Sequence, residues 1–155
     1  MSSDAALYNE EYLQIMKTFD SLSDMSCNRI ELIRDLARGL NYKTIGLANC
    51  VMFNRETKVI KEFLSKDFEV HSVNCKYGRL RENELFNGGS SRIICNPAGQ
   101  ANFLNENKCD MNVSIGLCVG HDMIFSSQSS APVTTLFTKD FTNGNDPAAA
   151  VDDIR

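Results

Sequence analysis

The sequence predicts a small α/β fold, a three-layer sandwich around a mainly parallel, four-stranded, Rossmann-like sheet, with extra helices at the N-terminus. From residue 44 onward, short apolar runs typical of buried strands alternate with helical patterns. A strand, a helix and a further strand joined in this way require the two strands to run parallel. The chain has 155 residues, of which 43% are apolar and 23% charged. These values suit one globular domain.

We therefore expect a single α/β domain over residues 1–155, with residues 1–27 as an N-terminal helical extension. The first helix is predicted from apolar residues at spacings of three and four, and we expect this stripe to be core: Tyr8, Tyr12, Ile15, Phe19 and Leu22. A second helix is predicted to begin after Asn28, because Glu31 three residues later completes a capping-box pair. Its apolar positions are Ile30, Ile33, Leu36, Ala37 and Leu40.

Strands are predicted at residues 44–50, 68–75, 111–118 and 133–138. Three helices alternate with them. The first follows a cap at Asn54, with Val59, Ile60, Phe63 and Leu64 as its apolar residues. The second is capped by Asn96 with Pro97 at its first position, and the third covers residues 121–128. The polar connection at 76–94 is longer than most loops in compact domains, and it is interpreted as either a lid or a passive linker.

Charge and hydropathy exclude two classes of partner. The 16 basic and 20 acidic residues give a net charge of −4, and no basic stripe is present to bind phosphates, so nucleic acid is not expected. No apolar stretch approaches the roughly 18 residues that span a bilayer, and the N-terminus lacks the blocks of a signal peptide. We therefore expect a cytoplasmic protein with no membrane partner.

Cysteines are the main indication of function. Parallel strands place their carboxyl ends at one edge of the sheet, where α/β proteins bind ligands. Three cysteines each end a predicted strand: Cys50, Cys75 and Cys118. Cys95 directly precedes the Asn96 cap, at the start of a helix that begins at the same edge. Four thiols are therefore predicted to meet, and four thiolates suit a zinc ion (Zn2+) or an iron–sulfur cluster.

Two other interpretations of these cysteines stay open. Buried cysteine is a common core residue, and a redox dithiol would need only two of the four. Their spacings match no linear zinc-finger motif, so the prediction depends on topology. Cys109 precedes a strand at the opposite edge and is excluded from the site. Cys27 lies just ahead of the second helix and is kept as a possible additional ligand.

Three further residues are predicted to border the same edge. His121 lies three residues beyond Cys118, where it could bind a metal, transfer protons or cap the short helix with Asp122. Lys139 and Asp140 end the fourth strand, where they could bind an anionic cofactor or pair with each other.

Several blocks of the sequence together resemble the family called domain of unknown function 1847. The blocks are 45–50 (IGLANC), 73–76 (VNCK), 95–101 (CNPAGQA), 116–122 (GLCVGHD), 131–136 (APVTTL) and 139–140 (KD), so the resemblance covers roughly residues 28 to 151. It implies a metal-binding protein without naming a reaction or a substrate. The family's cysteine-rich N-terminal segment is replaced here by the predicted helix at residues 8–22, and its Gly-His-Asn-Pro block reads GNDP at 144–147.

The first functional hypothesis is a metal-binding protein with a redox or accessory role, whose ligands are Cys50, Cys75, Cys95 and Cys118. It would act with a redox partner protein or a small molecule, and the sequence does not determine the oligomeric state. The alternative is a metal-free enzyme for a small molecule, with Cys118 as nucleophile and His121 as base. A third possibility is an interaction module without site chemistry. We also expect any metal site to be open on one side, because the predicted core is large enough to fold without metal.

Overall fold

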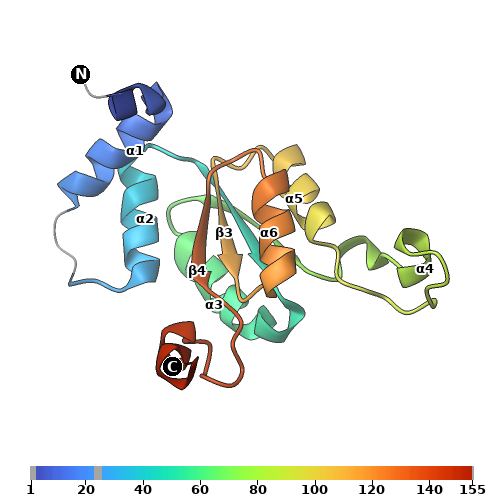
Figure 1. The fold of residues 1–155 in the computed structure, drawn as a ribbon. Helices are drawn as coiled ribbons and strands as arrows, with labels where there is room; N and C mark the ends of the chain where they lie inside the picture. The colour runs from blue at the N-terminus through green and yellow to red at the C-terminus, as the bar shows by residue number, and fades with distance from the viewer. Residues whose placement is uncertain (1–2, 23–25, 155) are drawn as a thin grey trace. The chain divides into compact units, whose positions relative to one another are not determined.

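Four parallel strands form one sheet in the order β2-β1-β3-β4 in the computed structural model, which describes residues 3–22 and 26–154 (Figure 1). The strands are β1 (Thr44–Asn49), β2 (Glu69–Asn74), β3 (Met111–Ile115) and β4 (Val133–Phe137). All three strand pairs are parallel. The α/β fold predicted from the sequence is confirmed, and the sheet is entirely parallel among the described residues.

The chain divides into two compact units, residues 1–43 and 44–155. The first contains a 3-10 helix (Ser3–Leu7), α1 (Glu10–Ser21) and α2 (Arg29–Gly39). Asn9 caps α1 by accepting a hydrogen bond from the backbone of Tyr12. The predicted capping box of Asn28 and Glu31 is present at the start of α2.

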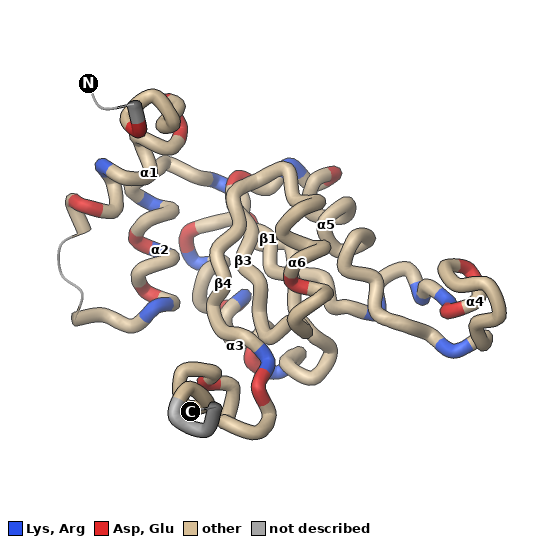
Figure 2. Tube along the Cα trace, in the orientation of Figure 1, with Lys and Arg blue, Asp and Glu red and all other residues tan. Residues whose placement is uncertain are grey.

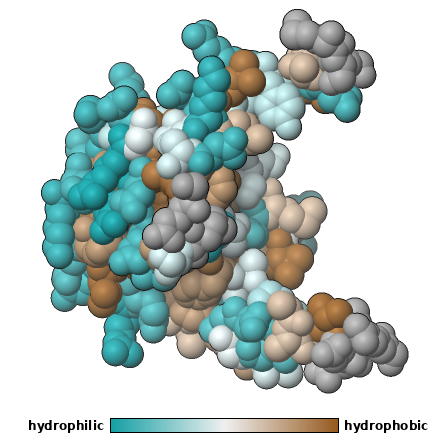
Figure 3. Space-filling view, turned by 90° about the vertical axis from the view of Figure 1, so that its left-hand side faces the viewer, coloured by the Kyte–Doolittle hydropathy of each residue, from teal (hydrophilic) through white to brown (hydrophobic). Residues whose placement is uncertain are grey.

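The apolar stripe of α1 is not the core element that its spacing predicted. Tyr8, Tyr12 and Phe19 are each more than 40% exposed, and the buried residue of the helix is Thr18. A side chain at Gly39 of α2 would overlap Thr18, so these two small residues allow the helices to approach closely. Figure 3 shows a largely hydrophilic face on which hydrophobic side chains appear between hydrophilic ones. Helical spacing therefore predicted α1 correctly, but it did not predict which face is buried.

Helices cover both faces of the sheet in the unit 44–155. α3 (Asn54–Leu64) lies on one face, and α5 (Pro97–Glu106) and α6 (Val119–Gln128) lie on the other (Figure 1). A short 3-10 helix (Val51–Phe53) precedes α3, so Asn54 is its first helical residue and not its cap. Val59, which was predicted to face the core, is exposed. α5 begins as predicted, with Asn96 accepting from the backbone of Gly99.

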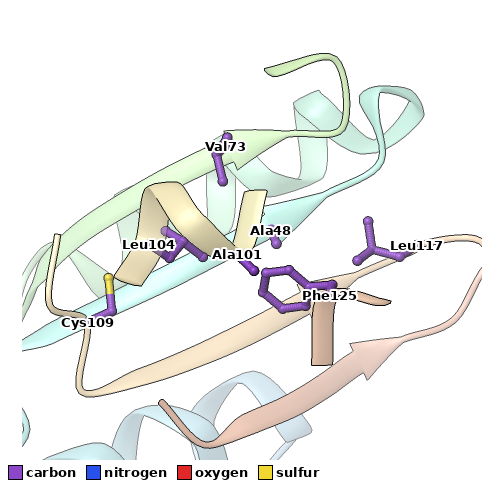
Figure 4. Close-up of a cluster of buried hydrophobic side chains, with 7 residues drawn as sticks. All are labelled: Ala48, Val73, Ala101, Leu104, Cys109, Leu117 and Phe125. Atoms are coloured by element: carbon purple, nitrogen blue, oxygen red, sulfur yellow. The ribbon is translucent and has the colours of Figure 1, made fainter. Parts of the chain in front are cut away.

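The core lies against the two central strands. Every residue of β3 and all but the first of β1 are buried, as expected for strands covered on both faces. One cluster fills the space between the sheet and the helices α5 and α6, with Cys109 and Leu117 at its opposite ends (Figure 4). Its members are Ala48, Val73, Ala101, Leu104, Cys109, Leu117 and Phe125.

The connection 76–94 contains secondary structure of its own. It contains a 3-10 helix (Tyr77–Arg79) and α4 (Glu82–Leu85), and an antiparallel bridge joins Arg81 to Ile93. The Glu82 carboxylate accepts hydrogen bonds from Ser90 and pairs with Arg92. Basic and acidic positions accordingly lie close together in this segment (Figure 2).

The last described element is a 3-10 helix (Pro147–Ile154). No helix among the described residues combines the length and the apolar character needed to cross a membrane.

We predict that Gly46→Ala lowers the free energy of unfolding by about 1–3 kcal/mol, the usual cost of overpacking a core. A Cβ at this position in β1 would overlap the Asn112 amide oxygen and the Leu104 side chain, both fully buried. Gly120→Ala in α6 is the matched control, because nothing lies within 4 Å of its Cβ position. That variant should be as stable as the wild type or more stable by up to about 1 kcal/mol. Urea unfolding measures both, and equal stability of the two variants would contradict the prediction.

Candidate functional site

Four cysteine side chains come together at the carboxyl edge of the sheet. Cys50 and Cys75 directly follow β1 and β2, Cys118 is the N-cap residue of α6, and Cys95 precedes the N-cap of α5. The sulfurs of Cys75 and Cys95 are 3.6 Å apart, and the Cys75 thiol is also hydrogen-bonded to Cys50. The topological argument from the sequence therefore places these side chains correctly, while their role stays a prediction.

Backbone hydrogen bonds hold three of these segments in place. The amide of Cys50 donates to the carbonyl of Ile115 (3.1 Å), and the amide of Cys75 donates to that of Asn49 (2.9 Å). The amide of Asn96 donates to the carbonyl of Cys75 (2.8 Å), which places Cys95 beside the end of β2. These bonds continue the pairing of the sheet beyond the strands, so the cysteine backbones share the rigidity of the sheet.

Strand ends also lie earlier than the sequence predicted, and Gly116 explains the largest difference. β3 stops at Ile115, three residues before Cys118. Gly116 has φ +60°, and a Cβ there would overlap the ring of Phe53, so the position requires glycine. The turn that it makes possible carries the chain from β3 to α6 and places Cys118 at the edge.

Polar side chains fasten α5 and α6 to the same edge. The fully buried Gln100 of α5 donates through Nε2 to the carbonyls of Asn49 (3.1 Å) and Val73 (3.0 Å). The Ser114 hydroxyl of β3 donates to the carboxylate of Asp122 in the first turn of α6 (2.9 Å). Both helices consequently begin at defined positions beside the thiols.

Two lysines contact the cysteine sulfurs. Lys139 Nζ lies 2.8 Å from Cys50 Sγ and 3.2 Å from Cys118 Sγ. Lys76 Nζ lies 3.6 Å from Cys95 Sγ. Within residues 3–22 and 26–154, neither ammonium group forms an ion pair with a carboxylate. Three of the four sulfurs, those of Cys50, Cys95 and Cys118, therefore lie in contact with an ammonium group.

The ion pair between Lys139 and Asp140, one of the two sequence interpretations, is not formed. The carboxylate of Asp140 instead accepts hydrogen bonds from the amide and the side chain of Asn143 (3.2 and 2.9 Å). Its backbone amide donates to Asn145 (3.0 Å). Asp140 thus stabilises the turn after β4, and the ammonium group of Lys139 contacts the cysteine sulfurs instead.

Burial and hydrogen bonding separate the thiols by acidity. Burial opposes ionisation of Cys50, but hydrogen bonds from Lys139, the Met52 amide and Cys75 hold the pKa of Cys50 below its usual value. Burial raises the pKa of Cys75 to about 11, and the neighbouring sulfur of Cys95 adds to this effect. Burial also disfavours the charge of Lys139, yet its contacts with Cys50 and Cys118 raise its pKa overall. Cys50 is therefore the more readily ionised thiol of the two, beside an ammonium group that stays charged.

His121 lies near this group without bonding to Cys118. Burial, followed by the charges of Lys139 and Lys76, lowers the pKa of His121, so its imidazole is neutral near pH 7. The polar partner of the Cys118 sulfur is Lys139. A thiol–imidazole pair would therefore need a side-chain movement, whereas a thiol–ammonium contact already exists.

The other two cysteines are placed elsewhere. Cys109 lies in the core at the end of the cluster opposite Leu117, in agreement with its exclusion from the site (Figure 4). Cys27 belongs to the N-terminal unit.

Sequence reasoning missed Lys76 and the apolar wall of a neighbouring cavity. Lys76 directly follows Cys75, and this adjacency was the available signal. The cavity wall includes Leu85, Phe86, Ile93 and Ile94, which are apolar pairs inside an otherwise polar connection.

No group of three or more His, Cys, Asp or Glu side chains in the described part of the chain is arranged to hold a metal ion. The four thiols form a contiguous series of contacts through Lys139 and not a cage around one point.

Comparison with known proteins identifies the family. The profile of a family described as "protein of unknown function (DUF1847)" matches residues 1–136. The chain belongs to this family. The match begins earlier and ends earlier than the resemblance at residues 28–151 suggested, and it includes the helices of the N-terminal unit. An uncharacterised protein of Methanocaldococcus jannaschii, MJ0455, is 39% identical over 131 residues, which cover 82% of this chain and 68% of the relative. No solved structure matches the chain.

In this DUF1847 protein, the pH dependence of stability tests whether Cys109 is buried in the core as described. Burial, together with the charges of Asp110 and Glu69, raises the pKa of the Cys109 thiol to about 11. The unfolded chain releases this proton at lower pH than the folded chain, so stability is lost as pH rises through the folded pKa. We predict that the difference in free energy of unfolding between wild type and Cys109→Ala decreases between about pH 8 and about pH 11.

The matched control is Val73→Ala, which truncates another side chain of the same cluster without removing an ionisable group. Its difference from the wild type should stay constant over this pH range. Urea unfolding at several pH values measures both differences, and a constant Cys109→Ala difference would show that the thiol is not protected from ionisation.

Proposed function

We propose that Cys50, Cys75, Cys95 and Cys118 bind one zinc ion or one iron–sulfur cluster, and that the protein is a metal-dependent redox or accessory factor. The observation that carries the proposal is the contiguous series of sulfur contacts at one edge of the sheet. These sulfurs come from four segments far apart in the sequence, and the parallel topology brings them together. The edge where they meet is the one at which α/β proteins bind ligands.

The donor set fits a thiolate-bound metal. Zinc at about 2.3 Å from four sulfurs places neighbouring sulfurs roughly 3.8 Å apart, close to the 3.6 Å between Cys75 and Cys95. The Lys139 ammonium already places a positive charge between Cys50 and Cys118. Loading would have to draw the four sulfurs around one point, because the described side chains are not so arranged. The metal would supply either Lewis acidity or electron transfer, depending on which one binds.

The lysines also suit the charge of such a centre. Four thiolates around Zn2+ carry a net charge of −2, which is costly to leave uncompensated in a partly buried position. Lys76 and Lys139 contact the sulfurs and pair with no carboxylate in the described ranges 3–22 and 26–154. Two ammonium groups would therefore balance the charge. The free thiols that the site requires persist in a reducing compartment, so we infer that the protein is cytoplasmic.

Metal analysis tests this proposal. Protein purified without oxygen is reconstituted separately with zinc and with iron plus sulfide, and metal and sulfide per chain are then measured. We expect about one zinc ion, or one cluster with its sulfide and broad absorption near ~400 nm. Cys109→Ala, whose cysteine lies outside the group, should bind as much as the wild type. Less than ~0.2 metal per chain under both conditions would refute the proposal.

We also predict that Cys50→Ser abolishes metal binding but preserves the fold. The core of the unit 44–155 is built from apolar side chains of β1, β3, α5 and α6, so it does not need metal to form. Circular dichroism should remain that of an α/β protein, and thermal unfolding should stay cooperative. Unfolding of this variant at room temperature would instead mean that the metal is structural.

A second candidate is a metal-free thiol enzyme acting on a small molecule, with Cys118 as nucleophile and His121 as base. The observation that favours it is the Lys139 ammonium group, which lies 3.2 Å from the Cys118 sulfur. Alkylation of each cysteine as a function of pH separates the two candidates. One hyper-reactive thiol supports the enzyme, whereas four protected thiols that become reactive after chelation support the metal.

A further inference from the structure

A cavity of about 400 Å3 lies between the connection 76–94 and the first turns of α5 and α6. Its lining includes Lys76, Phe86, Ile94, Cys95, His121 and Ile124. One of the four clustered thiols is therefore part of its wall. The volume falls in the range of sites that bind small molecules.

The charged groups lining this cavity are exclusively basic among the described residues. Lys76 and Arg92 line it, whereas no aspartate or glutamate does. Arg92 is paired with Glu82, whereas the Lys76 ammonium contacts the carbonyl of Ile93 (3.3 Å) and the sulfur of Cys95 (3.6 Å), and no carboxylate in residues 3–22 and 26–154 pairs with it. An uncompensated cation in a half-buried position attracts an anion more strongly than one in open water does.

The other polar groups around the cavity also indicate a positive electrostatic potential. The cavity meets the N-terminal ends of α5 and α6, which carry partial positive charge. The low pKa of His121, caused by burial and then by Lys139 and Lys76, agrees with a positive potential at this position. The neutral imidazole can donate one hydrogen bond to an anion.

The rest of the lining is apolar and partly open. Leu85 and Phe86 of the connection are 58% and 55% exposed, and Ile124 of α6 is 45% exposed. These side chains line one cavity, so the apolar part of a ligand could cover all three together.

The wall that carries these apolar residues is held in a defined position. Ile94 donates its amide to the carbonyl of Leu80 (2.9 Å), and the Glu82 amide donates to the carbonyl of Arg92 (3.0 Å). The pairing with Arg92 and the bonds from Ser90 hold the pKa of Glu82 at about 2, so this carboxylate stays charged at neutral pH. The connection 76–94 is thus built as one side of a binding cavity.

We infer that this cavity binds a small organic anion with a hydrophobic body, such as an aryl or branched alkyl carboxylate. Its anionic group would lie at Lys76 and His121, and its apolar part would lie against Phe86, Ile94 and Ile124. Whether this ligand is a substrate for chemistry at Cys50, Cys75, Cys95 and Cys118 rests on the proposed function. The chemical class of the ligand does not, because it is inferred for the metal-free protein, in which no carboxylate pairs with the Lys76 ammonium among the described residues.

The test compares two probes of the same shape, 3-phenylpropionate and its neutral amide, added to the 15N-labelled full chain. Amide shifts report where each binds and how tightly. The anion should bind about tenfold more tightly than the amide, since a hydrogen bond to a charged group contributes that much. Shifts should be centred on Lys76, Ile94, Cys95 and His121. Both probes are measured with metal-free and with metal-loaded protein, and metal content is determined separately.

Lys76→Met should remove the preference for the anion, and Lys58→Met, at an exposed position of α3, should keep it. Phe86→Ala should weaken the binding of both probes equally and leave the ratio of their affinities unchanged. This variant tests the apolar wall independently of Lys76. Equal affinity of the two probes, shifts elsewhere, or no binding of the anion up to about 10 mM would overturn the inference. Preference for the anion in a chain that binds no metal would overturn only the proposed function.

Discussion

Backbone hydrogen bonding at the ends of β1, β2 and β3 is the constraint on which the site depends. The amides of Cys50 and Cys75 continue the pairing of the sheet past the last strand residues, and Asn96 extends it to the segment that carries Cys95. The backbones at Cys50, Cys75 and Cys95 are therefore placed by bonds that do not depend on their side chains. A thiol could be exchanged for another small group without disturbing this framework, which is typical of a functional centre and not of a structural staple.

The arrangement also concentrates positive charge beside the cysteine sulfurs. Lys139 reaches from beyond β4 to two sulfurs, and Lys76 lies beside a third. Surface lysines normally find solvent or a carboxylate, because partial burial of an unpaired ammonium group is costly. A bound species that carries negative charge, whether thiolates around a metal or an organic anion, would compensate this cost. The cluster of four cysteines and the neighbouring cavity share Cys95, and Lys76 contacts both of them. The cluster and the cavity therefore form one continuous region of the molecule.

The ordered connection 76–94 gives that region a wall on one side. Its hydrogen bonds and its Glu82–Arg92 pair hold apolar side chains over a cavity instead of letting them collapse onto the core. A segment with so many internal bonds is positioned before any ligand arrives, which reduces the entropy lost on binding.

Much of this protein could be predicted from the sequence because its main signals are local. The change from helical to strand periodicity at residue 44 predicted the α/β fold, and Asn28 and Asn96 marked two helix starts correctly. Parallel strands share one carboxyl edge by geometry, so cysteines at strand ends had to approach each other.

Interactions between distant segments were decided only by the tertiary structure. The spacing of apolar residues in α1 does not determine whether another element covers them, and Tyr12 and Phe19 are exposed. Lys139 bonds to Cys50, 89 positions away in the chain, and not to its neighbour Asp140, which binds Asn143. Periodicity and capping depend on a few adjacent residues, whereas side-chain partners and cavity walls depend on how complete elements pack. The sequence by itself thus determined where the thiols meet, and the packing of the folded chain decided which charges and apolar surfaces surround them.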